Sequence, residues 1–154
     1  MFYTISEMAE KLGISASTLR YYEQQGILPF VERSSGGIRR FSDQDFAWLK
    51  VIECLKRSGL PIRDIKAFTD MAERGDESLR ERLTLFITQR DAVRKQMAEM
   101  RETLDILEFK CWYYEQAAQD GTEEIVRSLP LEKVPERYRK IRDRLDSIHQ
   151  LYKD

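Results

Sequence analysis

The stretch that decides the fold runs from Ser15 to Phe41 and reads SASTLRYYEQQGILPFVERSSGGIRRF. Ser15 can cap the amides of a new helix, and Leu19 and Tyr22 recur on one face of it. Gly26 suits the end of that helix, because glycine adopts a left-handed conformation at little cost. Two β-prone runs follow, at 30–33 and 38–41, and the Ser-Ser-Gly-Gly sequence between them is typical of a hairpin. The stretch predicts a short helix followed by a hairpin.

Hydroxyl, arginine and tyrosine side chains occupy the polar positions of this helix and hairpin. A small helix that follows another helix and precedes an arginine-bearing wing fits the grooves and backbone of duplex DNA. The alternative to DNA binding is that the hairpin is an ordinary solvent-exposed hairpin without a ligand. The residues predicted to contact DNA are Ser15, Ser17, Thr18, Arg20, Tyr21, Tyr22, Arg33, Arg39 and Arg40.

Helix signals flank the stretch on both sides. Thr4 and Glu7 match a capping box, which predicts a first helix to about residue 12, and Gly13 supplies the turn of a helix-turn-helix. Ser42 with Asp45 predicts a third helix to about residue 58, and a fourth follows until a glycine at 75. We expect the third and fourth helices to brace the DNA-reading part.

No proline or glycine interrupts residues 77–119, which predicts one long helix. Its apolar residues are spaced alternately by four and three, the heptad pattern of a coiled coil. One helix cannot cover such a stripe, so the pattern predicts a homodimer; it leaves parallel and antiparallel pairing open. Arg90 is the polar exception, which we interpret as fixing alignment or reaching an acid across the interface. The heptad stripe comprises Leu79, Leu83, Phe86, Arg90, Val93, Met97, Met100, Leu104, Leu107, Cys111 and Tyr114.

Gly121 ends the long helix, and two prolines at 130 and 135 mark a linker. A last helix is predicted from 135 or 136 to about 152, lying back on the long helix or on the head. Its aligned residues are Tyr138, Ile141, Leu145, Ile148 and Tyr152. The predicted fold is mainly α, with a winged helix-turn-helix domain at 1–75, a coiled-coil dimerisation helix at 76–120 and a tail with one helix at 121–154.

The composition bounds the function. Among 154 residues the formal net charge is only −1, but residues 33–40 carry three arginines and no acid, and a local basic patch suffices for phosphate contact. No run reaches membrane-spanning length, and no signal-peptide layout is present, so we expect a cytoplasmic protein. Cys54 and Cys111 lie far apart in helical patterns and imply no disulfide framework.

Three motifs resemble the MerR family of bacterial transcription regulators: Leu-Arg-Tyr-Tyr-Glu at 19–23, Gly-Ile-Leu-Pro at 26–29 and Gly-Ile-Arg-Arg-Phe-Ser at 37–42. The resemblance implies a winged helix-turn-helix head on an antiparallel dimer helix. It further implies binding to a pseudo-palindromic promoter and DNA distortion that lets RNA polymerase engage two elements that stand too far apart, hence an activator.

The same resemblance implies DNA contacts from the second helix and its flank, by Thr18, Arg20, Tyr21 and Tyr22, and from the wing, by Arg33 and Arg39. The family's wing pattern, Gly-Tyr-Arg-x-Tyr, stands here with isoleucine and phenylalanine in place of the two tyrosines. Contacts made by those phenol hydroxyls in relatives therefore do not carry over. Arg40 offers additional phosphate attraction in their place.

The thiols bear on sensing. Metal-sensing relatives need several thiolates, and Cys54, Cys111 and the single His149 are a poor ligand set, so we expect no metal and no cofactor. The 33 residues after Gly121 cannot form a large drug-binding domain. Cys54 resembles the third-helix cysteine of a family branch that responds to aldehyde, nitrosative or oxidative stress; nearby cations would favour its thiolate, and the alternative is a small buried hydrophobe.

An aromatic cluster at the end of the long helix leaves two interpretations. Trp112 and Tyr113, beside Cys111, could wall a pocket for an organic effector, or they could simply pack at the dimer interface, where we assign Cys111 a structural role.

The chain lacks a phosphate loop, a histidine base with a partner and a nucleophile motif, so we expect no enzyme. The alternative to a regulator is a coiled-coil adaptor whose winged head contacts proteins.

Overall fold

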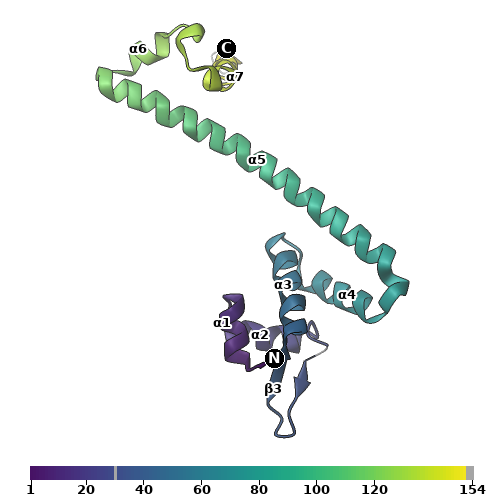
Figure 1. Ribbon diagram of the computed structural model, residues 1–154. Coiled ribbons are helices and arrows are strands. Elements are labelled where there is room, and N and C mark those ends of the chain that lie inside the picture. The colour runs from purple at the N-terminus through teal and green to yellow at the C-terminus, as the bar shows by residue number, and fades with distance from the viewer. Residues whose placement is uncertain (30, 152–154) are drawn as a thin grey trace. The chain divides into compact units, whose positions relative to one another are not determined.

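The computed structural model describes residues 1–29 and 31–151, with side chains up to residue 147. The chain divides into two compact units, Met1–Val93 and Arg94–Asp154, and the long helix α5 (Leu79–Asp120) contributes to both. The elements are drawn in Figure 1. The threefold division into 1–75, 76–120 and 121–154 remains a prediction.

The first two helices follow the capping signals of the sequence. α1 (Ile5–Leu12) begins with the capping box of Thr4 and Glu7 and ends at Gly13, which has a φ of 69°. α2 (Ala16–Gln24) begins where the Ser15 hydroxyl accepts the amide N–H of Thr18. These bounds confirm the helix-turn-helix predicted from the sequence.

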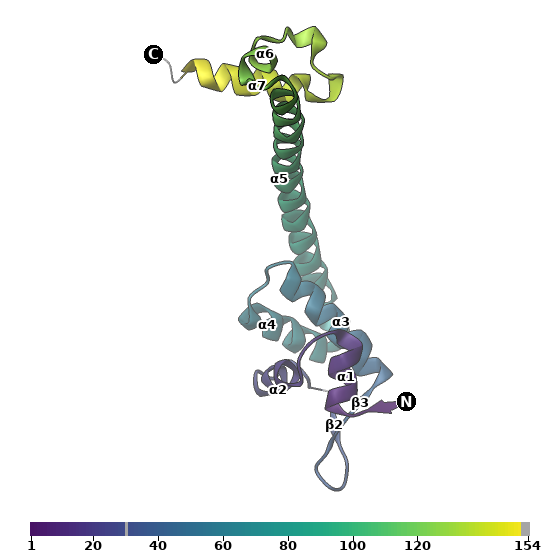
Figure 2. The ribbon, with the colours of Figure 1, turned by 90° about the vertical axis from the view of Figure 1, so that its left-hand side faces the viewer.

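A small sheet forms the wing and its base. β1 (Phe2–Tyr3), β2 (Glu32–Arg33) and β3 (Arg39–Ser42) lie in the order β1-β3-β2, with both pairings antiparallel. The loop between β2 and β3 projects beyond the helices of this unit (Figure 2). The hairpin was predicted, although the first strand is shorter than expected and Phe30 lies outside the described residues. The pairing of β1 with β3 was not predicted.

α3 (Asp43–Arg57) and α4 (Ile62–Glu73) complete the core of the first unit. Ser42 and Asp45 form the predicted capping box of α3, and Pro61 precedes α4. A short 3₁₀ turn, Gly75–Ser78, then leads into α5. Apolar side chains from all four helices are buried in one cluster. This cluster holds α3 and α4 against the helix-turn-helix, as the sequence predicted. Fully buried members include Met8, Leu19, Tyr22, Ile27, Leu49, Ile52 and Ile65.

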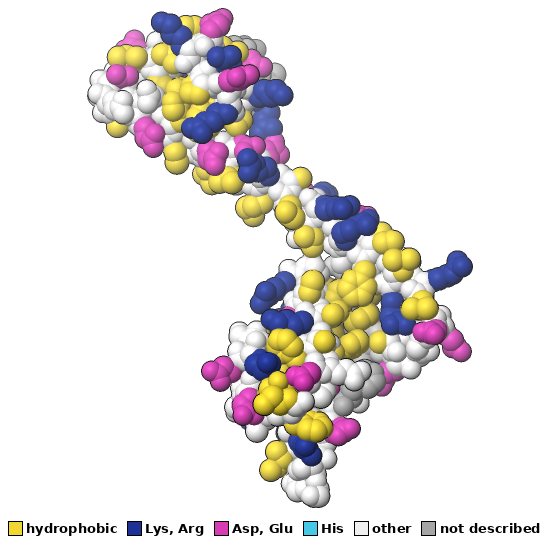
Figure 3. Space-filling view, in the orientation of Figure 1, with side chains coloured by type: hydrophobic (Ala, Val, Ile, Leu, Met, Phe, Trp, Pro, Cys, Tyr) yellow, Lys and Arg dark blue, Asp and Glu magenta, His cyan; other side chains and the backbone are white. Residues whose placement is uncertain are grey.

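α5 has 42 residues and, at 1.5 Å per residue, a length of roughly 63 Å. Its heptad stripe is exposed along most of its length, and Figure 3 shows hydrophobic side chains along the surface of this helix. Arg90 on the stripe pairs with its neighbour Asp91 at 2.9 Å, and the ion pair raises the pKa of Arg90. The exposed fractions include 60% for Leu83, 67% for Met97, 69% for Met100 and 57% for Leu107.

The second unit packs two helices against the C-terminal half of α5. α6 (Glu123–Ser128) was not predicted, because its six residues are too few for a periodic signal. A 3₁₀ turn, Leu131–Lys133, follows, and then α7 (Glu136–Leu151). Their shared core contains Phe109, Tyr113, Ala117, Val126, Val134 and Tyr138.

α7 lies back on α5, which confirms one of the two predicted positions. The Tyr138 ring lies 5.9 Å from that of Phe109 and 5.7 Å from that of Trp112, centroid to centroid. Arg144 also forms an ion pair with Glu102 of α5. Of the aligned residues, Ile141 and Leu145 pack against the core; the predicted positions of Ile148 and Tyr152 lie outside the described side chains. In the described chain, every helix is too short or too polar to span a bilayer.

Candidate nucleic-acid interface

Three hydroxyl groups gather at the start of α2. The Ser15 Oγ lies 2.7 Å from Oγ of Ser17 and 2.8 Å from Oγ1 of Thr18, and it accepts the Thr18 amide at 3.1 Å. Ser15 and Ser17 are exposed and Thr18 is half-buried. Because hydroxyls and a helix N-terminus both favour phosphate oxygens, this end of α2 can bind a DNA backbone.

Arg20 and Tyr21 lie on the outer side of α2. Arg20 is exposed and forms no hydrogen bond or ion pair with the described residues, so its guanidinium donors are available. Tyr21 is 43% exposed, and its ring lies 6.3 Å from that of Tyr22. Both side chains can reach a ligand that lies along α2, and their contact with DNA stays a prediction.

Tyr22 corrects the prediction. Its side chain is fully buried, and its hydroxyl donates to Oε1 of Glu53 on α3 at 2.5 Å. Burial, and then the hydrogen bond to the Glu53 carboxylate, raise the pKa of Tyr22 well above the ordinary 10.0. The buried ring cannot reach DNA in this structure. Tyr22 instead fixes α2 to α3, as its position on the apolar face of the helix also indicates.

The wing arginines Arg33 and Arg39 are joined to α2 by Glu23. Nη2 of Arg33 donates to Oε1 of Glu23 at 2.7 Å, and Nε of Arg39 donates to Oε2 of the same carboxylate. Nη1 of Arg33 also donates to the carbonyl of Gly37 at 3.3 Å. The two arginines are cross-strand partners in the β2–β3 ladder. The structure therefore brings the predicted wing cations together at the C-terminal end of α2.

Arg40 is held differently. It is exposed, and its guanidinium carbon lies 3.9 Å from the centroid of the Phe2 ring, a cation–π contact. Its cross-strand partner is Glu32. The contact leaves the N–H donors of Arg40 at the edge of the wing, where a phosphate could accept them.

Sequence reasoning missed Glu23, Glu53 and Phe2 as parts of this interface. Each acts on a predicted residue from a different element, so no local spacing indicates the pairing. One signal was available for Glu23: it is the single acidic residue in 16–24, on a helix whose other polar residues suit an anion.

Cys54 lies on α3 and is exposed, so its alternative interpretation as a small buried hydrophobe is wrong. The lysines expected to favour its thiolate contact aromatic rings: Nζ of Lys50 lies 5.4 Å from the Phe46 ring, and Nζ of Lys56 lies 5.4 Å from that of Tyr22. The thiol is thus accessible to a reagent from solvent.

Trp112 and Tyr113 belong to the second unit. Tyr113 is buried in its core and donates to Glu123 at 3.0 Å, and burial raises its pKa. Trp112 is half-buried and borders an open groove between α5 and α7, with the exposed Cys111. The aromatic wall of this groove therefore consists of Trp112 on α5 and Tyr138 on α7 of the same chain, and the buried Tyr113 does not line it. Among the described residues no cluster of His, Cys, Asp and Glu could hold a metal ion.

Comparison with known proteins finds the chain similar to DNA-binding regulators. Residues 3–72 match the family model for MerR HTH family regulatory proteins, and residues 46–108 match the model described as MerR, DNA binding. An uncharacterised HTH-type transcriptional regulator of Haemophilus influenzae is 43% identical over 136 residues, which cover 88% of this chain and 98% of the relative. The HTH-type transcriptional regulator AdhR of Bacillus subtilis is 34% identical over 86 residues, covering 56% of this chain and 61% of AdhR.

Solved structures show the same architecture. The crystal structure of HiNmlR, described as a MerR family regulator lacking the sensor domain and bound to promoter DNA, is 45% identical, with a TM-score of 0.78. The similarity covers 84% of this chain and 98% of that one. A MerR family regulator from Listeria monocytogenes, described as putative, is 32% identical with a TM-score of 0.71, covering 80% and 93% of the two chains.

Proposed function

Because the chain belongs to the MerR family of DNA-binding transcription regulators, we propose that it binds a pseudo-palindromic promoter as a homodimer and activates transcription by distorting the DNA. The family consists of regulators rather than enzymes. Membership of this family also weakens the adaptor hypothesis, in which the winged head contacts proteins instead of DNA.

The observation that carries the proposal is the exposed heptad stripe of α5. A free helix surface with leucine and methionine side chains more than half exposed over many turns is unusual for a monomer. A second copy can cover it because the spacing of four and three suits coiled-coil packing. The resemblance favours the antiparallel arrangement. The dimer would give two heads, and thus a twofold related operator.

On the DNA, we propose that the surface of α2 contacts the major groove and the adjoining backbone. Ser15, Ser17, Thr18, Arg20 and Tyr21 supply hydroxyl and guanidinium donors there. From the wing, Arg33, Arg39 and Arg40 would reach the flanking backbone. RNA polymerase is then a partner at the same promoter, through the altered shape of the DNA.

Sedimentation and DNA retardation test this proposal together. We expect a dimer at micromolar protein concentration and specific binding to a duplex from beside its own gene, with an affinity that falls steeply as salt rises. Transcription in vitro from that promoter, with a DNA-bending assay of the complex, tests activation by distortion. A monomer with α5 folded, or failure to retard any duplex at low salt, would contradict the proposal.

For the effector, we propose that the Cys54 thiol reacts with an electrophile. The supporting observation is its exposure on α3, next in sequence to Glu53, which binds Tyr22 of α2. The Cys54→Ser variant should bind the promoter normally but lose induction by electrophiles in transcription in vitro, whereas Cys111→Ser should respond like the parent. A normal response of the Cys54 variant excludes it as the sensor.

A second candidate effector site has its own observation. Trp112 and Tyr138 border the groove on α5 and α7 that also contains Glu108, Glu115 and Arg137, and aromatic faces with carboxylates suit an organic cation. The Arg137 guanidinium lies 4.5 Å from the centroid of the Tyr138 ring, so such a cation would bind beside the Trp112 face or displace Arg137. A panel of cationic organics in the same transcription assay separates the two: a response that Trp112→Ala removes and Cys54→Ser leaves intact assigns sensing to the groove.

A further inference from the structure

Glu23 is a carboxylate in a place where a carboxylate should be harmful to DNA binding. It lies in the last turn of α2, on the helix whose hydroxyl and guanidinium groups are proposed to contact the DNA backbone, and its side chain is 24% exposed. A negative charge there repels phosphates and so opposes association. A compensating role should therefore be visible in its contacts.

Those contacts connect one point on α2 to both strands of the wing. One carboxylate oxygen of Glu23 binds Arg33 on β2 and the other binds Arg39 on β3. These strands are only two and four residues long, so the ladder alone holds the wing weakly. The carboxylate adds two charge-assisted hydrogen bonds between the wing and the helix.

The arginines keep much of their capacity to bind phosphate. A guanidinium has five N–H donors. The bonds of Arg33 to Glu23 and Gly37 use two of these N–H donors, one on each Nη atom. Two positive charges and one negative charge leave the trio with a net charge of +1. Each arginine would otherwise lose side-chain rotamer entropy when DNA fixes it. Holding them beforehand reduces that cost.

We propose that Glu23 is the positioning residue of the wing: it fixes Arg33 and Arg39 at a set place relative to α2, so that specific DNA binding depends on a carboxylate that contacts no DNA. This inference rests on the proposed interface. It assigns to the two arginines a joint role in specificity, rather than two independent phosphate attractions.

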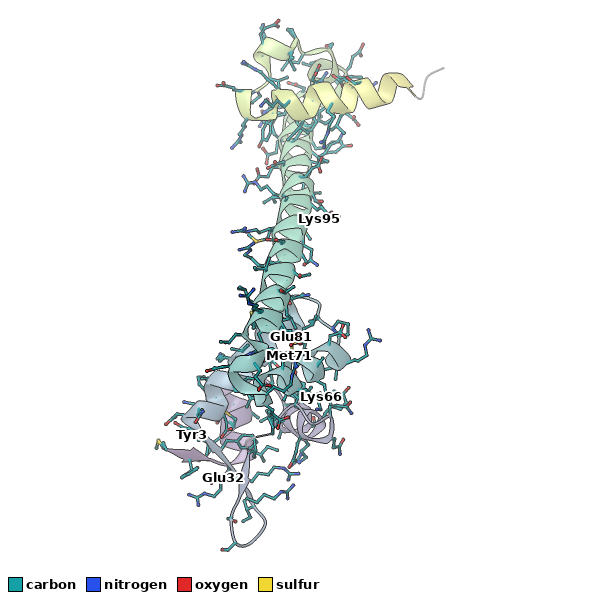
Figure 4. All side chains as sticks on the ribbon, turned by 90° about the vertical axis from the view of Figure 1, so that its right-hand side faces the viewer. Tyr3, Glu32, Lys66, Met71, Glu81 and Lys95 are labelled. Carbon is teal, nitrogen blue, oxygen red and sulfur yellow. The ribbon has the colours of Figure 1, made fainter. Side chains whose placement is uncertain are left out.

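The Glu23→Gln variant tests it, because charge and position predict opposite results. Removing a negative charge near DNA should strengthen binding to any duplex. Loss of positioning should weaken binding to the operator by about tenfold while binding to a scrambled duplex becomes tighter, so that the specificity ratio falls. Glu32→Gln is the matched control: Glu32 lies on β2 next to Arg33 (Figure 4), is exposed and forms no ion pair with the described residues.

We would measure both duplexes by fluorescence anisotropy at several salt concentrations, with thermal unfolding of each variant alongside. Glu23→Asp is the second variant, since it keeps the charge but shortens the reach to two arginines; it should lose specificity with unchanged binding to the scrambled duplex. In the Arg33→Gln/Arg39→Gln background, Glu23→Gln should no longer reduce operator binding.

If Glu23→Gln binds the operator as tightly as, or more tightly than, the parent, as Glu32→Gln should, the positioning role is overturned while the proposed function stands. If the parent protein shows no preference for its operator, both fail. An effect of Glu23→Gln that persists unchanged without the two arginines also overturns the proposal.

Discussion

Replacing Tyr22 with phenylalanine removes one oxygen atom and leaves the buried ring in place. The lost hydroxyl donates at 2.5 Å to a Glu53 carboxylate whose residue is only 8% exposed. A hydrogen bond to a charged group contributes about 1.5–3 kcal/mol, and the carboxylate would stay buried without this donor. We therefore expect the free energy of unfolding to fall by about 2 kcal/mol. Urea unfolding at fixed protein concentration, followed by circular dichroism, measures this change.

The neighbouring residue supplies the control. Tyr21→Phe removes the same atom from a ring that is 43% exposed, and should change the stability by less than about 0.5 kcal/mol. In a double-mutant cycle, Glu53→Gln and Tyr22→Phe should show a coupling energy of at least about 1 kcal/mol.

The pH dependence of the Tyr22→Phe effect has a definite sign. The pKa of Tyr22 is raised above its ordinary value of 10.0, chiefly by burial and then by Glu53. Below pH 10 both the folded and the unfolded chain keep the phenol proton, so the stabilisation is complete. Above pH 10 the unfolded chain releases the proton first, and the stability of the parent falls relative to the phenylalanine variant. Equal stability of the two phenylalanine variants, or a gap that does not narrow above pH 10, refutes the reasoning.

Three further changes test other parts of the structure. Arg40→Ala should lower the slope of log affinity against log salt by about one unit, and an unchanged slope in the retardation assay removes Arg40 from the DNA contacts. Met100→Glu places a charge on the exposed heptad stripe and should weaken the dimer at least about tenfold in sedimentation, while Glu99→Gln beside it should not; equal dimer constants would exclude the stripe as the interface. Arg142→Leu removes the donors to the Val126 and Arg127 carbonyls and should destabilise the second unit by about 2 kcal/mol in urea, and a variant as stable as the parent would show that these bonds are dispensable.

The helices of the head could be predicted because their ends carry local chemical signals. The capping boxes at Thr4 and Ser42 and the left-handed glycines at 13 and 26 each depend on residues within a few positions of one another. β1 could not be predicted as a paired strand, since two residues show no alternation and its partner is about 40 positions away. α6 was missed for the same shortage of residues.

The candidate site was predictable in its chemistry but not in its pairings. The outward-facing arginines and hydroxyls of α2 and the wing followed from residue type and spacing. Tyr22 illustrates the limit: one sequence motif suggested contact with DNA and the helical periodicity suggested burial, and the structure supports burial. Nothing in the sequence around Glu23 indicates that one carboxylate binds an arginine on each of two strands.

The unbroken run of α5 has an evolutionary consequence. Each residue of a helix advances the chain by 1.5 Å and turns it by about 100°, so a single deleted codon would rotate one part of the apolar stripe away from the rest. A change of seven residues restores its alignment to within about 20°, whereas changes of three or four residues require local overwinding or unwinding of the helix pair. The gene segment for residues 79–120 should therefore tolerate many point substitutions on its polar sides while rejecting nearly every small insertion or deletion, and new sensing parts are more readily appended beyond it than inserted within it.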